Sequence, residues 1–193
     1  MTDYMAPLLP LIDLIENEDI RNLLTGFMRN EVPAYFWNTG ASASGKYHPE
    51  FAKGEGGLVR HTAAVVKIAL ELFNLECMRD VDTGFGTDEI IVAAMVHDTF
   101  KYGITGPEDS EGKKLFHVHG ELAANMFEGY ALRHGFAVGD KTLRAIKCHM
   151  GQWTANESNR NPGESSLARI IHVADYIASR NFIDLPEFRK EGE

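Results

Sequence analysis

Residues 90–101 read IIVAAMVHDTFK, and they are the strongest indication of the expected fold. Its apolar part, residues 90–96, runs directly into His97 and Asp98. A segment that is apolar on all sides is typical of a central, buried helix. Ionisable groups at the end of such a helix are costly unless something compensates them. A bound cation is one compensation, because imidazole nitrogen and carboxylate oxygen are both good ligands for Zn, Mn, Fe or Co. The pair alone, however, is more typical of a hydrogen-bonded helix end. A metal site is favoured only if other parts of the chain supply further ligands.

Length and composition indicate a globular protein of one domain, or one domain with an extension. The chain has 193 residues, of which 44% are hydrophobic and 24% charged. Its net charge of −9 argues against a nucleic-acid coat or a membrane-surface binder, although bound cations could still attract a phosphorylated substrate. Two cysteines, no signal-peptide pattern and no long apolar run predict a cytoplasmic protein without a membrane segment.

Apolar spacing predicts an all-α protein without strands. Thr87 or Asp88 is expected to cap the central helix, and Gly135 to end a later one. The stretches 34–51 and 101–116 are expected to be loops. The expected helices cover residues 7–30 (two short helices or one bent helix), 58–78, 87–98, 119–134, 140–150 and 165–178.

These helices carry metal-type ligands on their apolar faces. A lone histidine on such a face is more often a hydrogen-bonded core residue than a ligand. Asp175 is different, because aspartate is rarely buried unpaired and its helical neighbours Ile171 and Ala178 face inward. The convergence of six such residues favours a metal site over six separate structural roles. The candidate ligands are His61, His97, Asp98, His119, His149 and Asp175.

Their order, H…HD…H…H…D, resembles that of the HD-domain superfamily of metal-dependent phosphohydrolases. The segment GGLVRHT, residues 56–62, looks like the opening of the helix that carries the first ligand in that family. HDTFK, residues 97–101, is similar to the family's HDxxK. The helix start at His119 and the segment before His149 also match. The closest resemblance is to the exoribonuclease-associated HD domain, in which a histidine precedes the GG turn, as His48 does here.

The resemblance implies two divalent transition-metal ions, of Mn, Fe, Co, Ni or Zn. Such a pair acidifies a bridging water to hydroxide and holds phosphoryl oxygens for in-line attack. Asp98 and Lys101 are the implied catalytic residues, with Lys101 meeting a phosphate oxygen; the alternative for Lys101 is a solvated loop lysine. The implied ligands of one ion are His61, His97, Asp98 and Asp175, and those of the other are His119 and His149 with Asp98 bridging.

We therefore expect an HD-domain helical bundle over residues 38–183, an N-terminal helical extension over 1–37 packed on it, and a polar tail over 184–193.

The expected activity is hydrolysis of a small phosphorylated substrate, a nucleotide or short phosphodiester, by a phosphodiesterase or nucleotidase. The charge and the lack of room for a separate nucleic-acid-binding domain disfavour long nucleic acid. Alternatives are an HD-fold di-iron oxygenase, a 3′–5′ exonuclease and a regulatory metal-binding module. Trp37 and Trp153 could stack on a base, but a place in the core is more typical.

Overall fold

The computed structural model describes residues 4–42, 48–78, 84–163 and 165–188. Within these ranges the chain forms helices and connecting turns without a strand, which confirms the all-α prediction. Short 3₁₀ turns lie between several helices. The α-helices are α1 (Leu9–Ile12), α2 (Glu18–Asn30), α3 (Ala34–Asn38), α4 (Gly57–Phe73), α5 (Thr87–Val96), α6 (Ser110–Leu115), α7 (His119–Arg133), α8 (Asp140–Cys148) and α9 (Ser166–Ala178).

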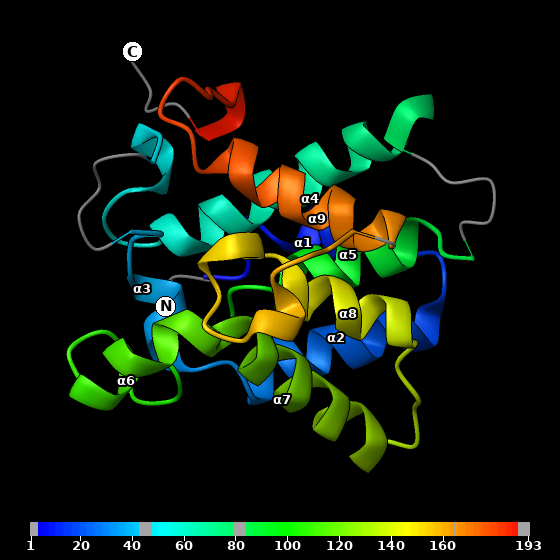
Figure 1. Cartoon of the computed structure of the whole chain (residues 1–193), viewed down its shortest axis with the longest axis horizontal. Helices are drawn as coiled ribbons and strands as arrows, with labels where there is room; N and C mark the ends of the chain where they lie inside the picture. The colour runs from blue at the N-terminus through cyan, green and yellow to red at the C-terminus, as the bar shows by residue number, and fades with distance from the viewer. Residues whose placement is uncertain (1–3, 43–47, 79–83, 164, 189–193) are drawn as a thin grey trace.

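Helix α5 lies at the centre of the molecule, as its uninterrupted apolar sequence predicts. Residues 90–96 are all buried. The helix packs against α4, α7, α8 and α9, and α4 and α9 run beside each other across it (Figure 1). A helix surrounded on every side needs no polar face, which is why its sequence lacks one. The C-terminal end of α5, with His97 and Asp98, therefore opens into the middle of the bundle.

The start of α5 differs from the prediction that Thr87 or Asp88 caps it. Gly86 is the N-cap, and the Glu89 carboxylate accepts a hydrogen bond from its backbone N–H at 2.8 Å. Asp88 instead accepts hydrogen bonds from the backbone N–H groups of Glu16 (2.9 Å) and Asn17 (3.0 Å). Asp88 therefore ties the break between α1 and α2 to the central helix, a long-range contact that a local capping rule does not anticipate.

Two stretches expected to be loops contain short helices. Helix α3 lies in 34–51 and α6 in 101–116, and both are too short to show a clear apolar period. Helix α3 has a role at the site. The Tyr35 hydroxyl donates to the carbonyl of Gly103 (2.8 Å) and accepts from the N–H of Tyr102 (2.9 Å). These bonds hold the turn that follows Lys101.

The N-terminal helices share the core of the bundle. Leu8, Ile12 and Leu24 are fully or almost fully buried in the same cluster as α5. The Phe27 ring lies edge-on to that of Phe127, with centroids 5.0 Å apart. The boundaries near residues 37 and 183 stay predictions, and residues 189–193 of the expected tail lie outside the described ranges. In the described ranges, every helix is too short or too polar to cross a membrane.

Candidate metal centre

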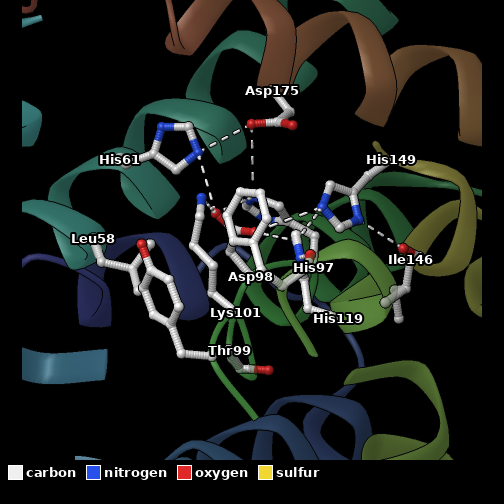
Figure 2. A network of polar contacts seen from close by, with 12 residues as sticks. Leu58, His61, His97, Asp98, Thr99, Lys101, His119, Ile146, His149 and Asp175 are labelled. Atoms are coloured by element: carbon white, nitrogen blue, oxygen red, sulfur yellow. Dashed lines mark hydrogen bonds and ion pairs between the residues drawn. The ribbon is translucent and has the colours of Figure 1, made fainter. Parts of the chain in front are cut away.

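The structure brings all six candidate ligands together at the middle of the bundle (Figure 2). The four histidines and Asp98 are buried, with at most 2% of each residue exposed, whereas the Asp175 side chain is 21% exposed. The six side chains enter from five helices or helix ends that surround the centre. The ligands come from α4 (His61), the end of α5 (His97 and Asp98), the start of α7 (His119), the end of α8 (His149) and α9 (Asp175).

The ligand atoms fall into two groups. In each group, one atom from each of three residues lies within 4.8 Å of the other two. In the first group, His61 Nε2 is 3.0 Å from Asp175 Oδ1. In the second, the Nε2 atoms of His119 and His149 are 2.9 Å apart. The groups are His61, His97 and Asp175, and Asp98, His119 and His149.

Asp98 faces both groups, one oxygen toward each. Its Oδ2 is 3.7 Å from His61 Nε2 and 3.6 Å from His97 Nε2. Its Oδ1 is 2.8 Å from His119 Nε2 and 3.6 Å from His149 Nε2. A carboxylate shared between two cations would lie in such a position, and the bridging role implied by the resemblance stays a prediction.

Three of the four imidazoles are oriented by backbone carbonyls behind them. In each, Nδ1 donates to the carbonyl three residues earlier, which leaves the Nε2 lone pair facing the centre. Such a bond behind a histidine fixes its tautomer and ring orientation for metal binding. The pairs are His97 with Ala94 (2.6 Å), His119 with Phe116 (2.5 Å) and His149 with Ile146 (2.8 Å).

The chemistry of this donor set fits a metal. Nε2 of His97 is buried without a hydrogen-bond partner in the described part of the chain, and Nε2 of His61, although 3.0 Å from Asp175 Oδ1, makes no hydrogen bond of good geometry. An unpartnered buried polar atom costs about 1–3 kcal/mol, and a cation at the centre would remove that cost. Burial lowers the pKa of His97 to about 4, despite the opposing charge of Asp98. The ring is therefore neutral at neutral pH, as a ligand must be.

Lys101 is part of the centre rather than a solvated loop lysine. It is 8% exposed, and its Nζ lies 2.6 Å from Asp98 Oδ2. Burial acts to raise the pKa of Asp98, but the Lys101 ammonium and the surrounding imidazoles hold it well below its ordinary value. Burial acts to lower the pKa of Lys101, but Asp98 and Asp175 raise it. Both members of the pair are therefore charged at neutral pH.

The centre borders a cavity of about 370 Å³. His48 lines it, with its ring centroid 5.6 Å from that of His61. Trp153 also lines the cavity and is 53% exposed, so the prediction that this tryptophan belongs to the core is wrong. Trp37, by contrast, packs against the core.

Tyr176 and Arg180 line the same cavity, and sequence reasoning missed both, although Tyr176 directly follows Asp175. A larger cavity of about 680 Å³ contains none of the candidate ligands.

Gly120 permits the close approach of α7 and α8 that brings His119 to His149. A Cβ at Gly120 would lie 2.8 Å from the Ile146 carbonyl oxygen and 3.0 Å from His149 Nδ1. We expect Gly120→Ala to lower the free energy of unfolding by about 1–3 kcal/mol, the usual cost of overpacking. Urea denaturation of the purified variant measures this change.

Gly129→Ala is the matched control, because Gly129 lies on the same helix and its added Cβ would meet only Arg133 Nη1, at 3.6 Å. Alanine favours helix over glycine by about 1 kcal/mol, so this variant should be as stable as the wild type or more stable. Equal destabilisation by both substitutions would contradict the close approach at Gly120.

The chain is similar to known proteins of one family. The model of the HD domain family matches residues 58–180, a span that contains all six candidate ligands. The dihydroneopterin 2′,3′-cyclic phosphate phosphodiesterase of Methanocaldococcus jannaschii is 28% identical over 187 residues, which cover 91% of this chain and 69% of that protein. No solved structure gives a significant match. The chain belongs to the HD domain family.

Proposed function

We propose that this chain is a metal-dependent phosphohydrolase that cleaves a small phosphodiester, such as a cyclic or short nucleotide. The observation that carries the proposal is the position of Asp98 between two groups of buried ligand atoms that border one cavity. Membership of the HD domain family and the similarity to a cyclic phosphate phosphodiesterase support the hydrolytic class.

Each part of the site has a role in this proposal. Divalent metal ions, when bound, would polarise phosphoryl oxygens and acidify a water molecule. Hydrolysis adds that water to phosphorus and breaks one P–O bond, and a proton ends on the leaving oxygen. The ligand groups are His61, His97 and Asp175, and His119 and His149, with Asp98 shared.

Lys101 has two roles in the proposal. Its ammonium keeps Asp98 ionised from a distance of 2.6 Å. It also lines the cavity, where it offers a positive charge to a phosphate oxygen. The second role predicts that Lys101→Ala impairs substrate handling more than metal content.

Metal analysis combined with a substrate screen tests the proposal. After reconstitution with Mn, Fe, Co, Ni or Zn, we expect about two equivalents of metal per chain, as in two-metal hydrolytic sites. We expect metal-dependent release of monoester from 2′,3′-cyclic nucleotides or dinucleotides. Less than one equivalent of metal would remove the basis of the proposal. Oxygen-dependent turnover of an unphosphorylated substrate by an iron-loaded sample would favour the di-iron oxygenase alternative instead.

Salt dependence separates small substrates from long nucleic acid. A chain with a net charge of −9 has little to gain from contacts with many phosphates. For a polyanion, the logarithm of the binding constant falls with the logarithm of the salt concentration. The slope steepens by about one unit for each phosphate that the protein neutralises. We expect kcat/KM on a small phosphodiester to change less than about threefold between 50 and 200 mM salt. Efficient cleavage of long RNA, with a steep salt slope and no activity on small substrates, would support the exonuclease alternative.

A further inference from the structure

The cavity beside the metal centre is aromatic at its exposed end. The residues at its buried end, such as Asp98 and His119, are 2% exposed, whereas Trp153 is 53% and Tyr176 46% exposed. The rings of Trp153 and Tyr176 are nearly parallel, with 11° between their planes and 6.3 Å between their centroids. Two large aromatic side chains that stay half in solvent beside a polar centre are available for a ligand.

Trp153 is joined to the metal centre by a short, constrained connection. It follows the candidate ligand His149 by four residues. Gly151, between them, has a φ of 57°, and a Cβ there would lie 2.5 Å from His172 Cε1. The His172 ring is in turn fixed by a hydrogen bond from its Nδ1 to the His149 carbonyl, at 2.6 Å. The position of Trp153 is thus set by the same segment that positions His149.

Tyr176 is held to the other side of the centre in a similar way. It directly follows Asp175 on α9. Arg180 lies one turn further along, donates from Nε to the Tyr176 carbonyl (3.1 Å) and places its guanidinium carbon 4.3 Å from the Tyr176 ring centroid. The two aromatic rings and Arg180 therefore lie at fixed positions relative to two ligands of the metal centre.

We propose that Trp153 and Tyr176 bind the planar nitrogen heterocycle of the substrate while its phosphoester lies at the metal centre. This inference rests on the proposed function and narrows its substrates to nucleoside-type or pterin-type phosphoesters. The cavity volume of about 370 Å³ falls in the range of small-molecule sites. Stacking also supplies affinity that does not depend on charge, which an anionic substrate needs on a chain with a net charge of −9.

Binding of unreactive analogues tests this subsite in the metal-loaded protein. The ligands are the phosphonate analogues of adenosine monophosphate, neopterin monophosphate and ribose 5-phosphate, which lack a hydrolysable ester bond. By calorimetry, we expect one or both ring-bearing ligands to bind about 10-fold or more tightly than the ribose ligand. Trp153→Ala should weaken binding of the ring-bearing ligand about 5- to 100-fold and leave the ribose ligand unchanged.

Two further variants give the controls. Trp153→Phe keeps an aromatic face and should retain binding to within about fivefold. Phe182→Ala removes an aromatic side chain that is 76% exposed but does not line the cavity, and it should bind all three ligands as the wild type does. Because Trp153 is half exposed, its replacement should leave the helix content measured by far-ultraviolet circular dichroism unchanged.

The outcomes separate this inference from the proposed function. Preference for the adenosine or the neopterin ligand identifies the source of the heterocycle, and either result supports the subsite. Equal binding of all three ligands, or unchanged binding to Trp153→Ala, overturns it. Ring-dependent binding without hydrolysis of any phosphoester would keep the subsite and overturn the proposed function. Equally efficient hydrolysis of ring-bearing and ringless cyclic phosphates would support the proposed function and overturn the subsite.

Discussion

Replacing Asp98 with alanine should abolish hydrolysis and reduce metal binding in both ligand groups. Its two oxygens face different groups, with Oδ1 2.8 Å from His119 Nε2 and Oδ2 3.6 Å from His97 Nε2. Asp98 belongs to the second group, yet its Oδ2 is also 3.7 Å from His61 Nε2 in the first. We expect kcat/KM to fall by about 10³-fold or more, since metal polarisation contributes several kcal/mol to such reactions. Elemental analysis should show fewer than one tightly bound equivalent.

The same substitution should destabilise the fold, for a reason that can be separated from catalysis. Asp98 is the ion-pair partner of Lys101, and removing it leaves a buried ammonium without that carboxylate. Breaking a buried pair by removing one partner typically costs about 3–5 kcal/mol. The double variant Asp98→Ala with Lys101→Met should regain part of the free energy of unfolding but none of the activity. Activity in the Asp98→Ala variant with its metal retained would show that another group performs the shared role.

The sequence was sufficient to predict the central part of the fold because long-range and local signals agree there. Apolar residues 90–96 must be enclosed on every side, which requires helices such as α4 and α9 around them. Ligand-type residues such as His61 and Asp175 stood on the apolar faces of those helices, so their convergence could be predicted before any geometry was known.

The remaining features depend on contacts that no local pattern carries. Helix α3 has five residues, too few to show a period. Its Tyr35 supports the turn after Lys101 through a hydrogen bond to Gly103, which lies 68 residues away in the sequence. Asp88 has the chemistry of a helix cap but binds the backbone of Asn17 instead. The exposure of Trp153 depends on a left-handed turn at Gly151, which places the ring beside the cavity rather than in the core. The division of the six ligands into two groups is implied by the family resemblance and not by any local pattern.

His149→Ala should separate the two ligand groups by removing a residue from only one of them. His149 Nε2 lies 2.9 Å from that of His119, whereas the first group, His61, His97 and Asp175, does not include it. We expect metal content to fall from about two equivalents to about one. We expect kcat/KM to fall about 10²- to 10⁴-fold, because a single ion would retain only part of the electrostatic stabilisation of the transition state.

A histidine outside the centre provides the control for this substitution. His134 ends α7 as an exposed residue, so His134→Ala removes an imidazole of the same chemistry without touching either group. It should keep both metal equivalents and the wild-type kcat/KM. The bond from His172 reaches the His149 backbone carbonyl, which alanine also has, so the turn that leads to Trp153 should survive in His149→Ala. Loss of activity there would therefore report on the ligand itself. Wild-type turnover by His149→Ala with one bound equivalent would instead mean that the first group alone carries the reaction.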